Sequence, residues 1–129
     1  MVRIEAALAL IKRRGRYLIC KRRAGDVLGG YWEFPGGKRK PRESWRACLR
    51  REMWEELGVA VKTIAPFMTL RHADRRCARH FKVYRCVLER GTPRPLASQA
   101  LRWVPARRLG RYRFPPANRP LIATLRDML

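Results

Sequence analysis

Acidic residues are scarce in this sequence, which has 10 Asp and Glu against 31 Lys and Arg and a formal net charge of +21. Histidine is rarer still, and the two present, His72 and His80, do not have the spacing of metal ligands. A histidine-based metal centre is therefore excluded, and we interpret both residues as structural. In so basic a sequence, a group of acids close together differs from the rest of the chain.

The cysteines lack the C-x-x-C spacing of a zinc site or a redox motif. All of them except Cys77 fall in segments that we expect to form regular structure. We therefore predict reduced, mostly buried thiols with no disulfide framework. The four are Cys20, Cys48, Cys77 and Cys86.

Long apolar runs are also missing, because no segment approaches the length of a membrane span. The first ten residues lack the layout of a signal peptide. A length of 129 residues with 47% hydrophobic content suits one globular domain over residues 1–129. We expect a cytoplasmic monomer that makes no contact with a membrane.

The strong positive charge predicts a polyanionic partner, either a nucleoside triphosphate or, non-specifically, a nucleic acid. Most of the basic residues are arginine, whose planar group makes bidentate contacts with phosphate. The alternative is a compositional bias toward arginine, because arginine is spread along the whole chain instead of being clustered.

Four of the ten acids lie in one segment, residues 37–59. Glu52, Glu55 and Glu56 stand at i, i+3 and i+4, so on a helix they share one face. Like charges placed there repel one another, and Mg²⁺ or Mn²⁺ relieves the repulsion because these ions prefer oxygen ligands. Arg51 precedes Glu55 by four residues and can pair with it, orienting its carboxylate. The alternative is a solvated acidic helix face.

Hydrophobic periodicity and turn residues predict a mixed sheet between helices, a fold of the α/β or α+β class. One helix follows the N-cap Ser44 and ends at Gly58, with an apolar stripe facing the core. We expect strands over residues 2–11, 16–21, 32–34, 59–73, 81–88 and 101–104, helices over 44–58 and 115–129, and turns at 12–15, 36–37 and 74–76. The apolar positions are Trp45, Leu49, Met53 and Leu57 in the first helix, and Leu121, Ile122, Leu125, Met128 and Leu129 in the last.

The acidic segment resembles the Nudix box at every defined position. The matching residues and spacing are Gly37, five residues, Glu43, seven residues, Arg51, Glu52, Met53, Glu55, Glu56, Gly58 and Val59. The resemblance implies an α-β-α sandwich with a mixed sheet and a metal-dependent enzyme that cleaves the diphosphate linkage of a nucleoside diphosphate joined to another group. It also implies site roles: Glu52, Glu55, Glu56 and the carbonyl of Gly36 as ligands of Mg²⁺ or Mn²⁺, Arg51 as a catalytic-site residue, and Gly37, Glu43 and Gly58 as structural positions.

Two further stretches resemble MutT-type 8-oxo-dGTP diphosphatases and their pyrimidine-nucleotide relatives. Residues 32–38, WEFPGGK, resemble the entry to their box, and residues 114–118, FPPAN, resemble their C-terminal segment. In that segment the resemblance implies that Asn118 reads an oxidised purine through its amide, which donates to one edge atom and accepts from the next. The alternative is that Asn118 is an ordinary helix N-cap. The resemblance also implies substrate contacts from Arg23, Phe34, Gly37, Lys38 and Arg79; a solvated loop arginine is the alternative for Arg23.

The sequence departs from MutT in one place, because no acid occurs from Gly91 to Arg126. MutT has a further glutamate in the loop before the strand that corresponds to the one holding Trp103. Here the general base must come from the box, or a metal-bound hydroxide must act without a loop base. Three functions stay open: hydrolysis of 8-oxo-dGTP to the monophosphate and pyrophosphate, a pyrimidine or general nucleoside triphosphate pyrophosphohydrolase, and a non-catalytic MutT-like DNA-recognition module, against which the intact box argues.

Overall fold

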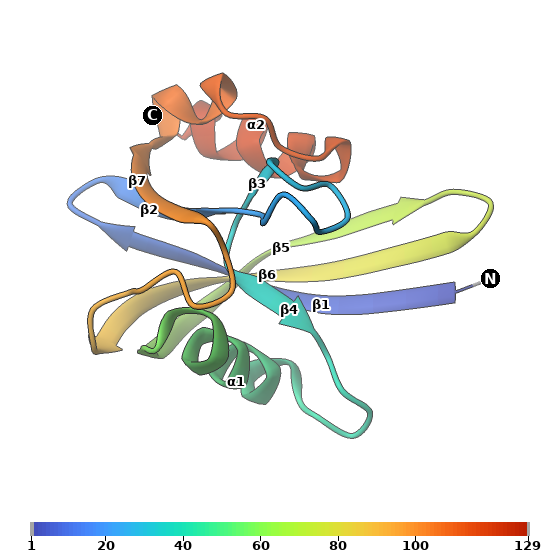
Figure 1. Cartoon of the computed structure of the whole chain (residues 1–129), viewed down its shortest axis with the longest axis horizontal. Helices are drawn as coiled ribbons and strands as arrows, with labels where there is room; N and C mark the ends of the chain where they lie inside the picture. Colours follow the sequence, from blue (N-terminus) through green and yellow to red (C-terminus); the bar gives the residue numbers. More distant parts are fainter. Residues whose placement is uncertain (1, 129) are drawn as a thin grey trace.

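A mixed β-sheet covered by one helix on each face is the framework of the protein (Figure 1). The computed structural model describes residues 2–128. The strands are β1 (Val2–Arg13), β2 (Arg16–Lys21), β3 (Trp32–Glu33), β4 (Gly36–Lys38), β5 (Ala60–Ala73), β6 (Cys77–Arg90) and β7 (Ala100–Pro105). The helices are α1 (Trp45–Leu57) and α2 (Arg119–Asp127), with two 3-10 segments, η1 (Ala106–Arg111) and η2 (Pro116–Asn118).

Strand β1 organises the sheet, whose order is β3-β2-β1-β6-β5, with β4 pairing β1 and β7 pairing β2. It runs parallel to β6, in register from Val2 opposite Cys77 to Ile11 opposite Cys86. The other strand pairs are antiparallel. The sheet is therefore mixed, as predicted.

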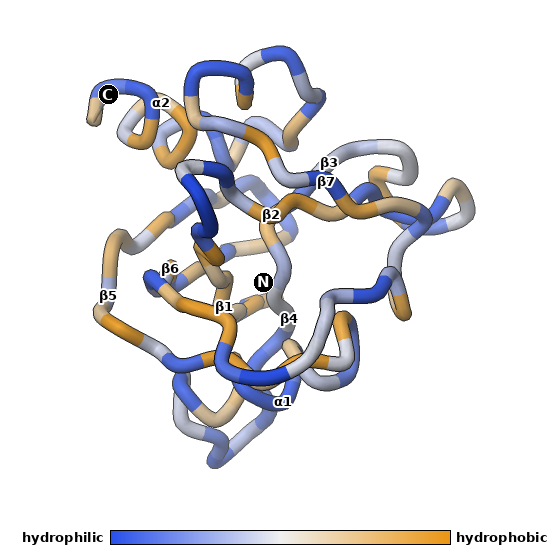
Figure 2. The backbone as a smooth tube through the Cα atoms, turned by 90° about the vertical axis from the view of Figure 1, so that its left-hand side faces the viewer, coloured by the Kyte–Doolittle hydropathy of each residue, from blue (hydrophilic) through white to orange (hydrophobic). Residues whose placement is uncertain are grey.

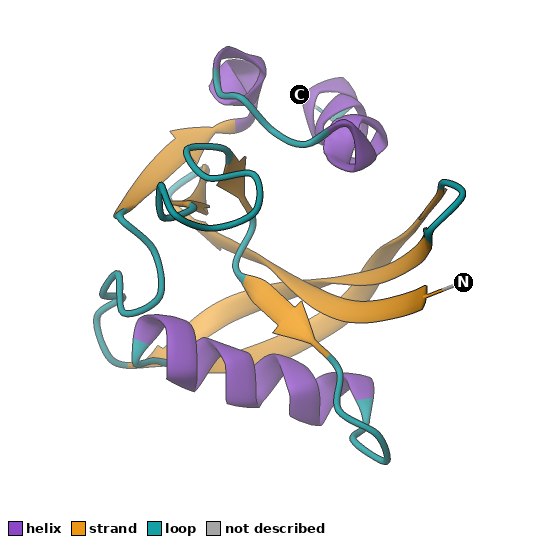
Figure 3. Cartoon of the chain, turned by 45° about the vertical axis from the view of Figure 1, so that its right-hand side comes forward, coloured by secondary structure: helices purple, strands orange, loops and turns teal. Residues whose placement is uncertain are grey.

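Successive side chains of a strand point to opposite faces, and the two faces of this sheet have separate hydrophobic cores. One core joins α1 to Ala7, Ala9 and Ile11 of β1. The other joins α2 to Leu10 of the same strand and to Val83 of β6. Figure 3 shows the two helices on opposite sides of the strands, which confirms the predicted α-β-α sandwich.

The predicted ends of α1 are confirmed. The hydroxyl of Ser44 accepts a hydrogen bond from the backbone N–H of Ala47 at 3.0 Å, which satisfies a free donor of the first turn. Gly58 ends the helix in the left-handed conformation, with φ at 67°. Three residues of the predicted stripe, Leu49, Met53 and Leu57, are fully buried, while Trp45 is half-buried.

Four local predictions were wrong. Gly36 and Gly37 form part of β4 instead of a turn, because Leu8 and Ala7 of β1 pair with them in an antiparallel ladder. Strand β6 starts at Cys77 and not at residue 81, because the Asp74 carboxylate accepts the N–H groups of residues 76 and 77, each at 2.8 Å, and closes a tight turn.

The last helix begins at Arg119 and not at residue 115, because the consecutive prolines Pro115 and Pro116 lead into η2. Its core face consists of Leu121 and Leu125 with Ile122 partly buried against the same core, while Met128 is 59% exposed and lies off that face. Leu129 lies outside the described residues.

The distribution of polarity agrees with the remaining predictions. In Figure 2, orange hydrophobic stretches run along β1 and β5, and blue hydrophilic segments mark many of the turns. All four cysteines are buried and unpaired, and Cys77 starts a strand instead of lying outside regular structure. Among the described residues, no helix is both long enough and apolar enough to cross a membrane.

Candidate active site

Arg51 is the centre of a hydrogen-bonded network on the exposed edge of α1. Its guanidinium makes a bidentate pair with Glu43, at 2.7 and 2.9 Å, and donates to Glu52 at 2.7 Å. It also reaches Glu55 at 3.2 Å and the backbone carbonyl of Lys38 at 3.0 Å. The predicted contact with Glu55 is present, but Glu43 is the stronger partner because it is held by two short, charge-assisted bonds.

The charge of Glu43 is fixed by this network. Hydrogen bonding from Arg51, followed by the backbone N–H of Lys40, lowers the pKa of the Glu43 carboxyl to about 2. Glu43 therefore stays ionised over the physiological range and joins the segment before α1 to the middle of that helix. This position agrees with the structural part that the sequence suggested for it.

Glu56 lies in the opposite electrostatic situation, although it is only four residues from Glu52 on the same helix. Burial, the charge of Glu33 and the charge of Glu52 together raise the pKa of Glu56 to about 9. A hydrogen bond from the backbone N–H of Gly36 acts against this increase but does not cancel it. Without a cation, Glu56 therefore keeps its proton near neutral pH, because the surrounding protein does not stabilise another negative charge at this point.

Glu33 is a further acid beside the carboxylates of α1, and the sequence reasoning did not include it in the site. It lies opposite Cys20 on β2, and burial raises its pKa even though Arg22 pairs with it at 2.9 Å. The pKa of Cys20 is raised by burial and then by Glu56 and Glu33, which places all three groups together. A lone acid between two buried aromatic residues, Trp32 and Phe34, was the signal in the sequence.

The two glycines before the box allow a close approach of backbone to carboxylate. A Cβ on Gly37 would overlap the carboxylate of Glu52, and a Cβ on Gly36 would overlap the backbone carbonyl of Ala7. Any side chain at either position would therefore push β4 away from β1 or from α1. This requirement explains why glycine stands at both positions.

The acids at this site suit a hard divalent cation, because they offer crowded carboxylate oxygens that a cation would hold in the ionised form. Within residues 2–128, no three Asp, Glu, His or Cys side chains already converge on one point. Glu52 points to Arg51, and the side chain of Glu55 is 53% exposed. Each of these two acids gives one oxygen to Arg51, Oε1 of Glu52 and Oε2 of Glu55, and keeps its other oxygen for a cation.

Asn118 belongs to a second region, on the other face of the sheet. It is 6% exposed and directly precedes α2, which is the position of an N-cap, but its side chain makes no cap hydrogen bond. Its amide atoms are not among the fully buried side-chain atoms left without a partner, which in the described part of the chain are Nε of Arg39 and Nε2 of His80. Asn118 therefore stands at the N-cap position of α2 without capping the helix through its side chain.

Aromatic packing fixes the surroundings of Asn118. Phe34 is 1% exposed and stacks on Phe114, with ring centroids 5.3 Å apart and planes 30° from parallel. Pro115 and Pro116 then set the backbone direction into Asn118, whose N–H donates to the carbonyl of Pro115 at 3.0 Å. The box entry and the C-terminal segment are thus brought together through their aromatic rings.

The other predicted substrate residues are more scattered. Lys38 is exposed on β4, and its carbonyl is occupied by Arg51. Arg79 pairs with Asp74 at 3.6 Å, and strand alternation with Phe81 places it on the face covered by α2. Arg23 is exposed and donates to the backbone carbonyl of Leu96 at 2.8 Å.

The segment without acids is tied to the loop after β2 instead of contributing to the carboxylate cluster. The backbone N–H of Gln99 donates to the carbonyl of Lys21 at 2.9 Å, and its side-chain amide donates to the carbonyl of Arg22 at 2.7 Å. These contacts, with the one from Arg23 to Leu96, give residues 92–99 a structural position next to the site.

Comparison with known proteins agrees with this geometry. The family model described as NUDIX domain matches residues 6–124. A CTP pyrophosphohydrolase of Escherichia coli K12 is 35% identical over 124 residues, covering 95% of this chain and 90% of that protein. An 8-oxo-dGTP diphosphatase of the same strain is 30% identical over 131 residues, covering 99% of this chain and 100% of that protein. The solution structure of the E. coli ORF135 protein superposes with a TM-score of 0.85 at 31% identity, covering 99% of this chain and 91% of that one.

Proposed function

From membership of the NUDIX domain family, to which this chain belongs, we propose that it hydrolyses 8-oxo-dGTP to 8-oxo-dGMP and pyrophosphate. At the coarser level it is a nucleotide pyrophosphohydrolase, an enzyme acting on phosphoric anhydrides. The nucleobase of the substrate is inferred from the side chains around Asn118.

The amide of Asn118 is the observation that supports this substrate. Because the side chain makes no cap hydrogen bond to α2, its donor and its acceptor are available to a ligand. The amide has a donor and an acceptor side by side. Between the Phe34–Phe114 stack and α2, it lies in apolar surroundings where a flat base can be held.

An amide distinguishes 8-oxoguanine from guanine through the atom next to O6. In guanine both O6 and N7 are acceptors, so the carbonyl of Asn118 would face a lone pair. In 8-oxoguanine N7 carries a proton, and one amide can donate to O6 while accepting from N7–H. The wrong base leaves the buried carbonyl unsatisfied, and discrimination of this kind is steep.

CTP is a second candidate, favoured by the relative that is a CTP pyrophosphohydrolase at 35% identity. Cytosine also places an amino donor beside a ring acceptor, and an amide can pair with both. Asn118 alone therefore separates 8-oxoguanine from guanine but does not separate it from cytosine.

Members of this family generally use a divalent metal ion, typically Mg²⁺, which neutralises phosphate charge and activates water when bound. Glu52, Glu55, Glu56 and the Gly36 carbonyl are the groups that we assign to hold it. Arg51 positions two of these acids through the contacts described above. Because residues 92–98 contain no acid, either a carboxylate of the box would take the proton of the attacking water or a metal-bound hydroxide would act without a loop base.

A pyrophosphate-release assay with Mg²⁺ on 8-oxo-dGTP, dGTP, CTP and dCTP tests the proposal. We expect kcat/KM for 8-oxo-dGTP to exceed that for dGTP by about a hundredfold or more. A higher value for CTP than for 8-oxo-dGTP would replace the proposed substrate by the second candidate. Metal-dependent hydrolysis of none of the four would overturn both.

A further inference from the structure

A hollow at the tip of the β1–β2 hairpin lies outside the site described above. Its volume is about 360 Å³, within the range of small-ligand pockets. The lining residues are Arg13, Arg14, Arg16 and Trp103. The first three surround the turn between β1 and β2, and Trp103 lies on β7, which pairs with β2. No acid of the box and no residue near Asn118 takes part in it.

The arginines of this hollow differ from those at the carboxylate cluster because they have no acidic partner. Arg22, Arg39, Arg51 and Arg79 each pair with a carboxylate. Among the described residues, no ion pair and no side-chain hydrogen bond involves the three hairpin arginines, all of which are exposed. The hollow is therefore a concentration of positive charge with nothing inside the protein to neutralise it.

An aromatic surface accompanies this charge. The guanidinium of Arg13 lies over the Trp103 ring, 4.3 Å from its centroid, so a cation–π contact is already present. Trp103 is half-buried and packs against the hydrophobic core that includes the buried face of α1. A fixed aromatic group beside free guanidinium groups is the combination that binds the bases and phosphates of single strands.

The hairpin turn places an arginine in a backbone conformation that arginine disfavours. Arg14 and Gly15 both have positive φ, 52° and 77°, between the paired residues Arg13 and Arg16. A two-residue turn of this kind favours asparagine or glycine at its first position. Arginine occupies that position here although its Cβ disfavours the conformation.

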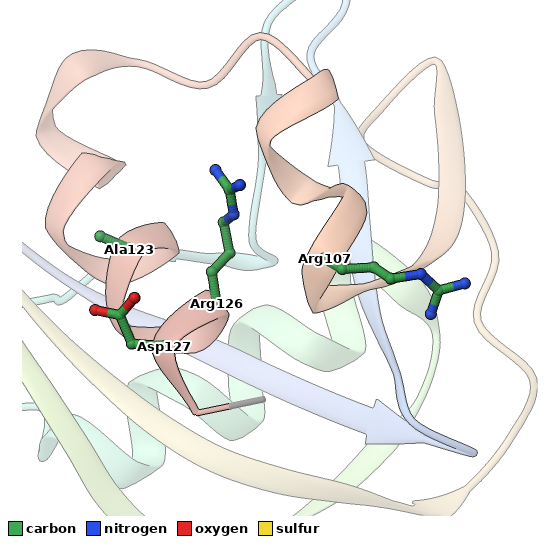
Figure 4. Close-up of a pocket in the computed structure, with 4 residues that line it drawn as sticks. All are labelled: Arg107, Ala123, Arg126 and Asp127. Atoms are coloured by element: carbon green, nitrogen blue, oxygen red, sulfur yellow. The ribbon is translucent and has the colours of Figure 1, made fainter.

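A second hollow provides an internal contrast. It has a volume of about 330 Å³ and is lined by Arg107, Ala123, Arg126 and Asp127. Figure 4 shows Arg107 and Arg126 extending in different directions, with the carboxylate of Asp127 on the same helix as Arg126. It contains an acid and no aromatic ring, so it lacks both properties that distinguish the hairpin hollow.

We propose that the hairpin hollow binds single-stranded nucleic acid, with phosphates on Arg13, Arg14 and Arg16 and a base stacked at the contact of Arg13 with Trp103. This site is separate from the hydrolytic one and does not depend on which nucleotide is hydrolysed. The favoured partner is a single strand because duplex bases are already stacked on each other, whereas an unpaired base is free to stack on the ring and the guanidinium.

Two triple variants with equal charge test the proposal. One replaces the hairpin arginines, R13Q, R14N and R16Q, with asparagine chosen at position 14 because it tolerates positive φ. The matched control is R3Q, R75Q and R76Q, which removes three exposed arginines beyond the opposite end of β1, about 36 Å away at the strand rise. Figure 1 shows these two ends of the sheet on opposite sides of the molecule.

Fluorescence anisotropy with a labelled 20-nucleotide oligothymidine measures binding. We expect the hairpin triple to weaken binding at least tenfold and to reduce the salt slope by about 2, while the control changes binding less than twofold. Trp103→Leu should weaken binding to the single strand several-fold, and Trp103→Phe should retain it. All variants should hydrolyse nucleotides like the unmodified chain, which reports that each is folded.

Three results would overturn the proposal. Equal losses in the two triples would show that net charge alone attracts the oligonucleotide. Equal affinity for a 20-base-pair duplex would remove the role of the ring. Binding to vesicles of phosphatidylcholine and phosphatidylserine, without binding to oligothymidine, would identify a membrane surface instead.

Discussion

Polar side chains are held in opposite ways in two regions of the molecule, the carboxylate cluster around Arg51 and the region around Asn118. The cluster is dense in charge, and one arginine holds three of its acids in place. The Asn118 region is apolar, and the buried side chain of Asn118 makes no cap hydrogen bond to α2. The first region is therefore organised by its own polar contacts, whereas the second is organised by packing and leaves its polar group for a ligand.

A single short strand connects the two regions. Glu33 on β3 lies with the carboxylates of α1, and the next residue, Phe34, lies in the core of the opposite face. Neighbouring residues of an extended segment point in opposite directions, so a shift of one residue would exchange acid and ring. The two regions thus share a rigid support although their contents differ.

Among changes in the carboxylate cluster, Glu56→Gln is expected to cause the largest loss of activity. We expect kcat to fall by roughly a hundredfold or more, because a carboxylate assigned to the metal and the reacting phosphate is replaced by a neutral amide. Glu89→Gln, at an exposed acid near the end of β6, is the matched control and should be neutral. Steady-state rates with Mg²⁺ and thermal melts measure both variants. Near-normal activity in Glu56→Gln would contradict the ligand assignment.

The corresponding test of the second region is Asn118→Ala. We expect kcat/KM for 8-oxo-dGTP to fall about tenfold to a hundredfold while that for dGTP changes little, because only the oxidised base uses both amide atoms. The thermal melt should hardly move, since the side chain makes no cap bond.

Ser44→Ala is the matched control for Asn118→Ala, because Ser44 does make its cap bond. It should cost about 1 kcal/mol of stability with no change in the ratio of substrates. If Asn118→Ala behaves like Ser44→Ala in both measurements, the 8-oxoguanine assignment loses its support.

The Arg51 network predicts a pH dependence of stability. The pKa of Glu43 is lowered from 4.5 to about 2 by folding, so its contribution is present above pH 4.5 and is lost as the pH falls toward 2. Glu43→Gln should therefore lower the melting temperature at pH 7, and the difference from the unmodified chain should shrink below pH 4.5. Thermal melts of both proteins across this pH range measure the difference in melting temperature. A difference that stays constant in acid would show that the contribution of Glu43 does not depend on its charge.

The smallest effect is expected between the two regions, at Gln99. Its amide donates to a backbone carbonyl of the adjacent loop and does not lie with the carboxylates. Gln99→Ala should change kcat by about twofold at most, with a loss of stability near 1 kcal/mol for the lost hydrogen bond. A hundredfold loss of rate with an intact fold would mean that this loop takes part in the chemistry.

The carboxylate helix could be predicted from the sequence because its information is local. Ser44, the stripe ending at Leu57, and Gly58 specify the helix and its ends within one continuous segment. The face shared by Glu52, Glu55 and Glu56 then follows from helical geometry alone. Arg51 was expected to contact Glu55 but prefers Glu43, which lies before the helix and so escapes a rule based on helical spacing.

The remaining features of the fold and the site could not be predicted, because they depend on contacts between residues that are distant in the sequence. Glu33 joins the acids only because β3 pairs with β2, and Phe34 finds Phe114 across 80 residues. The glycine pair was expected to form a turn, since glycine is weak in strands, but the ladder with β1 outweighs that preference. The start of α2 was misplaced because the two prolines suit either a first turn or the separate segment that they form here.

The parallel pairing of β1 with β6 determines the order in which this protein can be assembled during synthesis. Every pair along that ladder joins residues 75 positions apart, from Val2 with Cys77 to Ile11 with Cys86. The core beneath α1 includes Tyr84 and Cys86, so this helix has no complete surface to dock on until β6 has left the ribosome. Contacts of such long separation slow folding, and the carboxylate cluster therefore matures late, after nearly three quarters of the chain has been made.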